Sequence, residues 1–329
     1  MQSLILTSLL ALCQGLALAS SLQAAPSNAA PALPEEIVAV GGQGAALVQS
    51  GVASVSDQAA IHLNPAMLYL HRAYDVGGGY FWPSAGRPFY KLSVIDGVTS
   101  RMVAAFEYTG FQDNLRDRNQ ADAIGDSSVM KRGSVALAIP TDFFVIGFAG
   151  HYVEAQGPVD ETLEPTNYKG ISLGVGLVAL LSNQLRLGLS LENFNNKRVA
   201  SVAPRTARAG LSWEDRTATV TLHGELRQRD RSATFELTDP VLDGLTLAAA
   251  PRDDRPEQMA LTGLQVKTFD MLKVFAGYGR TLRGETQDVM GGGVGIFQRQ
   301  FSFSYAASKI SPAAKDWQSS LHLSLTMKI

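Results

Sequence analysis

The sequence has little charge and a single cysteine. Asp, Glu, Lys and Arg make up 18% of its 329 residues, and the formal net charge is −2. Proteins that bind nucleic acid normally carry a basic surface, so this balance argues against a nucleic-acid partner. Because Cys13 is the only cysteine, a disulfide within the chain, a zinc ribbon and thiol catalysis are excluded.

The five histidines do not form a metal-binding motif. They stand at positions 62, 71, 151, 223 and 322, in neither an HExxH nor an HxH pattern. A metal hydrolase normally brings at least two such ligands from one local motif. We therefore expect no resident metal, no cofactor, no catalytic residue and no enzymatic activity.

The first 25 residues contain no charged side chain. The apolar stretch from Leu4 to Leu18 is too short for a membrane-spanning helix, which needs about 20 residues. Small residues follow it, as a signal-peptidase site requires, and Ala24 or Ala25 is the expected last residue removed. We predict a signal peptide over residues 1–25 and a Pro/Ala-rich spacer over residues 26–34.

The rest of the chain has no run of 18 apolar residues, but many segments alternate apolar and polar residues. Leu321 to Ile329 and Leu185 to Leu191 are two of them. Side chains of a strand point to opposite faces in turn, so each segment has one apolar and one polar face. Such alternation is typical both of a soluble sandwich and of a barrel in a membrane.

Strand length and the spacing of connections favour the barrel. Most predicted strands approach the 9–11 residues of a tilted membrane-spanning strand, and short connections alternate with longer polar ones. We predict an all-β antiparallel transmembrane barrel over residues 71–329, in the outer membrane of a Gram-negative bacterium. The predicted strands are 73–82, 88–97, 100–109, 131–140, 143–152, 168–180, 183–193, 205–214, 216–227, 259–268, 271–280, 287–297, 299–308 and 319–329.

Residues 35–70, before the first predicted strand, differ from the barrel in composition. They are rich in glycine and alanine and nearly uncharged. A wide barrel has room for such a chain in its lumen, so we predict that residues 35–70 form a plug, or hatch.

The plug sequence resembles the start of the FadL-like outer-membrane transporters, a family that also has a branch associated with protein secretion. The resemblance covers roughly residues 41–70, with Met67 standing where the family commonly has glycine. It implies a fourteen-strand barrel with a hatch inside, and a hydrophobic ligand such as a long-chain fatty acid. The matching residues are Gly42-Gln43-Gly44-Ala45-Ala46, Gly51-Val52-Ala53, Asp57 and Asn64-Pro65-Ala66.

The Asn-Pro pair of this motif also has a physical interpretation. Pro65 fixes its own φ and restricts Asn64 to extended geometry, while an Asn side chain can bond the nearby backbone. We expect a turn here that directs the chain into the wall. Our candidate plug and gating residues are Gly42, Gly44, Asp57, Asn64, Pro65 and Ala66. A purely structural role for them is an equally strong hypothesis.

Polar side chains on one predicted strand form a second candidate group. His223, Glu225 and Arg227 are two residues apart, so all three should face the same side, which we take to be the lumen. A salt network in contact with water explains them more simply than catalysis does. The glycine run at 291–293 is expected to permit a bend or close approach of the plug to the wall.

Four functions remain open at this point. The first is passive transport of hydrophobic small molecules, with the plug as a gate. The second is a scaffold or secretion-system component that binds a protein partner. The third is an outer-membrane enzyme that depends on His223, and the fourth is a porin for polar solutes. In each case membrane lipid and the barrel-assembly machinery are expected partners.

Overall fold

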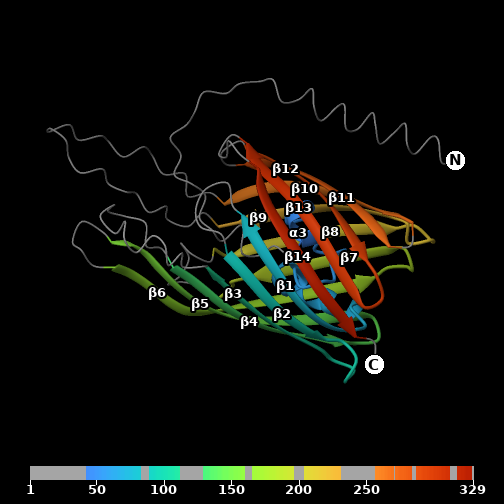
Figure 1. The fold of residues 1–329 in the computed structure, drawn as a ribbon, viewed down its shortest axis with the longest axis horizontal. Coiled ribbons are helices and arrows are strands. Elements are labelled where there is room, and N and C mark those ends of the chain that lie inside the picture. The colour runs from blue at the N-terminus through green and yellow to red at the C-terminus, as the bar shows by residue number, and fades with distance from the viewer. Residues whose placement is uncertain are drawn as a thin grey trace. The chain divides into compact units, whose positions relative to one another are not determined.

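The computed structural model describes residues 42–82, 89–111, 129–159, 165–195, 204–230, 256–269, 271–283, 287–311 and 317–327. The predicted signal peptide, the spacer, the first residues of the predicted plug and most of the predicted loop 228–258 lie outside these ranges. Within them, fourteen antiparallel strands close into a barrel, and β14 pairs with β1 (Figure 1). The predicted fold class and strand number are confirmed.

Each strand pairs with its neighbours in the sequence. The strands are β1 (Tyr74–Trp82), β2 (Phe89–Asp96), β3 (Val103–Phe111), β4 (Val129–Pro140), β5 (Phe144–Val159), β6 (Pro165–Leu180), β7 (Leu185–Glu192), β8 (Thr206–Glu214), β9 (Val220–Arg229), β10 (Glu257–Thr268), β11 (Leu272–Arg283), β12 (Asp288–Phe297), β13 (Phe301–Ser311) and β14 (Gln318–Met327).

The predicted strand limits are wrong mainly at three places, one of which is the start of β3, expected at residue 100 and observed at Val103. Residues 153–167 were expected to form a loop, but β5 and β6 continue pairing to Val159 and Pro165, with a shift of register after Gln156. Such a bulge accommodates proline, which cannot donate a ladder hydrogen bond. The connection between β8 and β9 is also longer than the single residue expected, because Asp215 accepts hydrogen bonds from Thr219 N and Val220 N and so organises a wider turn.

The barrel is apolar outside, and many of the wall side chains that face inward are polar. On β8, Arg208 and Ser212 are buried, whereas the side chains between and beyond them, Leu211 and Trp213, are 48% and 42% exposed. A soluble sandwich would bury the apolar face and expose the polar one. The reversed arrangement is the one expected of a barrel surrounded by lipid.

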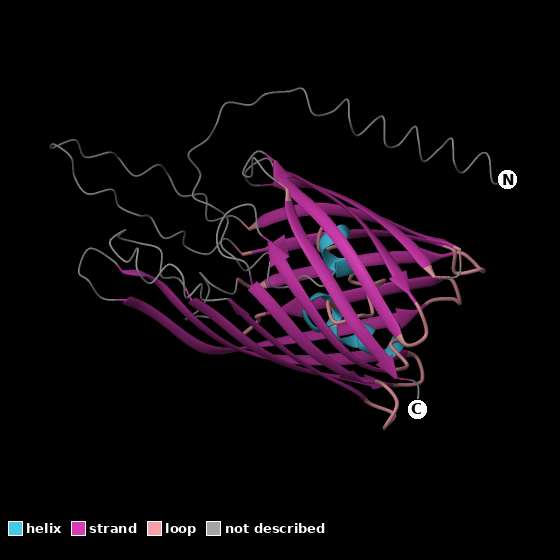
Figure 2. Ribbon diagram, in the orientation of Figure 1, coloured by secondary structure: helices cyan, strands magenta, loops and turns pink. Residues whose placement is uncertain are grey.

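Residues 42–70, which we call the inner segment, lie inside the barrel (Figure 2). They form helix α3 (Gly42–Ala46), helix α4 (Ala60–Leu63) and the 3₁₀ helix η2 (Pro65–Leu70). Helix α3 lies against β11 to β14, and η2 lies against β3 to β6. None of the described helices is long and apolar enough to cross a membrane.

The inner segment and the wall together form the apolar core. Ile61, Met67 and Leu68 pack with wall residues such as Val103 and Val178 in one buried cluster. A second cluster joins the inner segment to β11 and β13, and consists of Ala46, Leu47, Val55, Ala59, Leu63, Phe275 and Ala306. The hydrophobic effect therefore holds the segment against two sides of the lumen.

Wall glycines let the inner segment approach closely. A Cβ placed on Gly291 would lie 2.7 Å from the Ala46 carbonyl oxygen, which confirms the close approach predicted for the 291–293 run. The fit is tighter at Gly188, where a Cβ would lie 2.3 Å from the Val52 oxygen. Since that atom belongs to the backbone, a side chain at position 188 must displace the segment.

We predict that Gly188→Leu weakens docking of the inner segment by about 1–3 kcal/mol, as overpacking does in a filled interior. The readout is the thermal unfolding of the barrel in detergent, together with protease cleavage of residues 42–70. Gly224→Leu is the matched control, because a Cβ on Gly224 meets nothing within 4 Å. Equal effects of the two substitutions would contradict the close fit at Gly188.

Candidate functional site

Asn64 forms the predicted turn and ties it to the wall. Its side-chain amide donates to the Val52 oxygen at 2.7 Å and to the Leu177 oxygen of β6 at 3.2 Å, and its Oδ1 accepts from Ala66 N. Pro65 then starts η2 at the first helical position, where a missing N–H costs nothing. The sequence did not reveal that the turn continues as a 3₁₀ helix up to Leu70.

The other candidate plug residues are distributed along the segment. Gly42 begins α3, and the carbonyl oxygen of the buried Gly44 accepts a hydrogen bond from Gln49 N at 2.7 Å. Asp57 accepts a hydrogen bond from Ala59 N at 2.9 Å, just before α4. The structure therefore gives these residues local structural contacts, and their role in gating stays a prediction.

His223, Glu225 and Arg227 of β9 all point into the lumen, where they contact the inner segment. His223 Nε2 lies 2.7 Å from Ser50 Oγ. Glu225 Oε2 accepts hydrogen bonds from the backbone amides of Gly51 and Val52, at 2.8 and 2.9 Å. These side chains therefore form a docking site for residues 49–52.

Two arginines complete this docking site. Arg208 of β8 lies 3.1 Å from Glu225 Oε1 and also donates to the Gln49 oxygen. Arg227 donates to Gln49 Oε1 at 3.3 Å. Arg208, Glu225 and Arg227 are all buried, so our expectation of a network in contact with water was wrong. The inner segment covers the network and takes the place of water as its partner.

The Ser50–His223 pair lacks the geometry of a catalytic triad. In a triad a carboxylate orients the second imidazole nitrogen, but here Ser54 Oγ lies 3.2 Å from His223 Nδ1. Residues 170–174, GISLG, match the GxSxG pattern, yet Ser172 lies within β6 rather than at the sharp strand-to-helix turn that exposes a nucleophile. The contacts of Ser50 and Ser54 indicate structural roles for these two serines.

We predict that Glu225→Ala releases residues 49–52 from the wall. The change removes the acceptor of two amides and leaves the Arg208 guanidinium buried without its carboxylate, which typically costs about 3–5 kcal/mol. Hydrogen exchange at the Gly51 and Val52 amides should become faster. Glu154→Ala is the control, because its ion pair with Lys169 is partly exposed. Unchanged exchange at both amides would contradict the docking role of Glu225.

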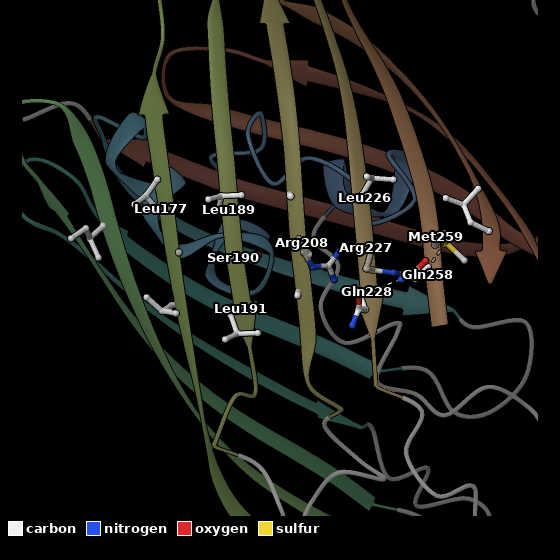
Figure 3. Close-up of a pocket in the computed structure, with 16 residues that line it drawn as sticks. Leu177, Leu189, Ser190, Leu191, Arg208, Leu226, Arg227, Gln228, Gln258 and Met259 are labelled. Carbon is white, nitrogen blue, oxygen red and sulfur yellow. Dashed lines mark hydrogen bonds between the residues drawn. The ribbon is translucent and has the colours of Figure 1, made fainter. Parts of the chain in front are cut away.

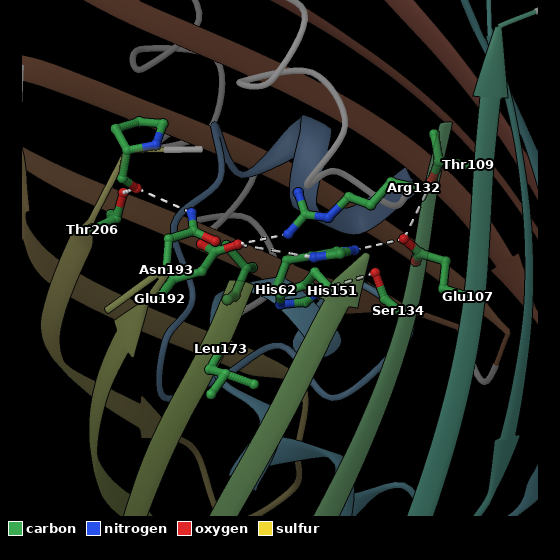
Figure 4. Close-up of polar contacts among 12 residues, drawn as sticks. His62, Glu107, Thr109, Arg132, Ser134, His151, Leu173, Glu192, Asn193 and Thr206 are labelled. Carbon is green, nitrogen blue, oxygen red and sulfur yellow. Dashed lines mark hydrogen bonds and ion pairs between the residues drawn. The ribbon is translucent and has the colours of Figure 1, made fainter. Parts of the chain in front are cut away.

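A second polar cluster surrounds His62 of α4 (Figure 4). Its Nε2 lies 2.5 Å from Glu107 Oε1, and Lys91 Nζ lies 3.1 Å from the other oxygen of Glu107. On the opposite side, Arg132 pairs with Glu192 at 3.1 Å. All five side chains are buried, and four of them come from the strands β2, β3, β4 and β7.

His151 of β5 joins this cluster through its ring. The His62 and His151 rings stack with their centroids 5.0 Å apart, and His151 Nδ1 lies 2.9 Å from Ser134 Oγ. His62, His151 and Glu192 each offer one possible metal ligand, and these atoms lie within 4.8 Å of one another. Sequence reasoning missed this group because its members are far apart in the chain and meet only when the barrel closes.

Burial changes the protonation of the inner segment. It raises the pKa of Asp57 to about 6, and the nearby Asp75 adds to the effect, whereas the Ala59 amide, Lys91 and Lys273 oppose it. Burial lowers the pKa of His62 even though Glu107 beside it favours the charged form. Burial therefore shifts both side chains toward their neutral forms inside the barrel.

We predict that the contribution of Asp57 to docking of the inner segment becomes more favourable as the pH falls from about 7 to 5. An undocked Asp57 titrates near its ordinary value of 3.8, whereas the docked one titrates at about 6, so only the docked Asp57 gains a proton in this window. The gain is lost as the pH rises through 6. His62 opposes this, because burial lowers its pKa and it is protonated more readily when the segment is undocked. Protease resistance of residues 42–70, measured at several pH values, is the readout.

The Asp57→Asn variant separates the effect of Asp57 on docking from that of the buried histidines, which weaken docking as the pH falls. The variant should dock more firmly than the natural chain at pH 7, and the difference should shrink toward pH 4. An identical pH profile for the two proteins would show that Asp57 does not titrate as described.

A groove of about 820 Å³ lies on the outer side of the wall over β5 to β11 (Figure 3). Ala209 forms part of its floor, directly between Leu189 of β7 and Leu226 of β9. The two leucines are exposed and longer than the alanine, which makes this face hollow. Arg208 and Arg227 also border the groove, but their side chains contact Gln49 in the lumen.

Comparisons with known proteins give the fold a class. No protein-family model matches the sequence, and a search of curated proteins finds no match. Among solved structures, the monoaromatic hydrocarbon channel CymD is 12% identical with a TM-score of 0.62, covering 87% of this chain and 96% of its own.

Two further structures agree with CymD. The Pseudomonas putida toluene transporter TodX is 11% identical, with a TM-score of 0.58 and coverage of 88% of this chain and 98% of its own. A Pseudomonas aeruginosa FadL homologue is 12% identical, with a TM-score of 0.55 and coverage of 87% and 97%. The chain therefore has the fold of the FadL-like barrels, which confirms at the level of the fold the resemblance seen in the sequence.

Proposed function

We propose that this protein carries hydrophobic small molecules passively across an outer membrane, and that the inner segment gates the passage. The observation that carries the proposal is the shared fold. Structures described as hydrocarbon channels and transporters match it over nearly their whole length. The inner segment, held in the lumen by named contacts, supplies the gate.

The outward face of the wall supports a location in the outer membrane. Exposed apolar side chains such as Leu226 and Leu323 alternate with buried polar ones along the strands. A closed barrel leaves no unpaired strand edge for lipid to cover. Together with the predicted signal peptide, this favours export and insertion into the outer membrane of a Gram-negative bacterium.

The packing inside the lumen requires movement for transport. Residues such as Leu47, Ile61 and Met67 are buried against the wall, so a molecule that follows their path must displace them. The outer groove does not offer an alternative, because its leucines face away from the lumen. We therefore propose two states of the segment, docked and displaced.

The driving force would be partition rather than an energy source. An apolar ligand gains about 0.8 kcal/mol for each CH₂ group removed from water. Long-chain fatty acids and monoaromatic hydrocarbons both fit this requirement, and the neighbours named above favour the aromatic class as the first to test. Transport in liposomes should therefore be measured with toluene and with oleate.

A disulfide between the inner segment and the wall tests the gate. Ser212 Oγ of β8 donates to the Ala53 oxygen at 2.7 Å, so the two residues lie side by side. The chain's only cysteine, Cys13, is in the predicted signal peptide. Ala53→Cys combined with Ser212→Cys therefore gives one defined pair, and the two single variants are the controls.

We predict that the oxidised double variant loses most of its toluene or oleate flux and regains it after reduction. Both single variants should keep their flux under oxidising conditions. Full flux through the oxidised pair, with the disulfide verified by mass, would contradict gating by this part of the segment. It would favour the scaffold hypothesis if the natural chain also carries no ligand.

A further inference from the structure

His62, His151 and Glu192 converge from three separate elements on one buried point. They come from α4 of the inner segment, from β5 and from the end of β7. His62 Nδ1 lies 4.0 Å from Glu192 Oε1, and one possible ligand atom from each residue lies within 4.8 Å of the others. Two nitrogens bound tetrahedrally to one zinc ion are about 3.4 Å apart, so the longest separation in the set would have to shorten by about 1.4 Å.

One nitrogen of each imidazole is already held by a neighbouring side chain. The Glu107 carboxylate holds His62 Nε2 at 2.5 Å, and the Ser134 hydroxyl lies 2.9 Å from His151 Nδ1. A carboxylate or hydroxyl on one nitrogen of a metal-bound histidine fixes the tautomer and aims the other nitrogen at the metal. Glu107–His62 has the arrangement of such a carboxylate–histidine pair.

The nitrogens on the other side of each ring have no hydrogen-bond partner. His62 Nδ1 and His151 Nε2 are buried and unpaired, and so is the hydroxyl of Ser172, which stands directly opposite His151 on β6. A buried polar atom without a hydrogen-bond partner destabilises the folded protein. Three such atoms close together therefore indicate a missing partner. A bound cation with a water ligand would supply that partner.

We propose that His62, His151 and Glu192 bind a divalent transition-metal cation of the zinc type. Two imidazoles and one carboxylate are a common ligand set for zinc with an open fourth position. The ion would join α4 to β5 and β7, and would thus fasten the inner segment to the wall. This proposal concerns metal binding alone and does not depend on what the barrel transports.

Arg132 supplies a discriminating test of the site. Its guanidinium holds Glu192 Oε1 at 3.1 Å, so its charge opposes a cation on the same carboxylate. In a metal site, removing that charge frees Glu192 and tightens binding. In a purely structural ion-pair network, the same change would only weaken the fold.

The experiment uses the full barrel, purified in detergent without a histidine tag and freed of metal with a chelator. Zn²⁺ is titrated by calorimetry, and the bound metal is counted by mass spectrometry after gel filtration. Co²⁺ is used as a second probe, because its visible spectrum reports coordination by nitrogen and oxygen. The variants are His151→Gln, Arg132→Gln and the control His322→Gln, another buried lumen histidine.

We expect one Zn²⁺ per chain in the natural protein and in His322→Gln, and its loss in His151→Gln. Arg132→Gln should bind roughly tenfold more tightly, since like charges a few ångströms apart repel strongly. Zn²⁺ should also raise the unfolding temperature of the natural protein but not of His151→Gln. If His151→Gln does not fold, as judged by its β-sheet circular dichroism, Glu192→Gln tests the same loss.

Three results would overturn the proposal. They are no retained Zn²⁺ in the natural chain, equal binding by the natural chain and the ligand variant, or weaker binding by folded Arg132→Gln.

Discussion

Glu225 on the wall accepts hydrogen bonds from two consecutive backbone amides of the inner segment while Arg208 balances its charge. The rest of the lumen depends on contacts of this kind. A backbone amide or a charge that is buried there without a partner would raise the free energy of the docked state by more than the surrounding apolar contacts lower it. Asn64 does the same at the other end of the segment, where it bonds both Val52 and β6. The inner segment and the polar side chains on the inner face of the wall thus act as hydrogen-bond partners for each other.

The need to form these hydrogen bonds explains why the wall has small residues where the inner segment approaches it. Where the segment's backbone must come within hydrogen-bonding reach of the strands, the wall has glycine, as at Gly188 beside Val52 and at Gly147 beside Ala66. Apolar side chains of the segment then fill the space between those close approaches. The polar contacts set the position and the apolar packing supplies most of the favourable energy, so a displaced segment gives up both together.

The strands of the wall can be predicted well from the sequence because each strand pairs with its neighbours along the chain. An alternation with a period of two, broken by turn residues, locates fourteen strands and identifies the inward side chains where these are polar, as for His223, Glu225 and Arg227. The extension of β5 and β6 was missed because Gly157 and Pro158 resemble a turn, and only pairing across the hairpin outweighs that signal. The turn at Asn64 was predictable from its own chemistry, but the 3₁₀ helix after it was not.

The polar clusters could not be predicted because they depend on closure. His62 and Glu107 are 45 positions apart, and Ser50 and His223 are 173 positions apart. Their meeting depends on the register of every strand between them and on the path of the segment through the lumen. For the same reason, histidines that form no local motif gather into a possible metal site at His62 and His151.

In the proposed mechanism, transport requires displacement of a segment that is docked at rest. The most direct measurement is hydrogen exchange at the amides of residues 46–68 in liposomes, recorded with and without a sustained flux of toluene or oleate. We expect these amides to lose protection during flux while those of the wall strands keep it. Sustained flux with the inner segment fully protected would contradict gating by this segment.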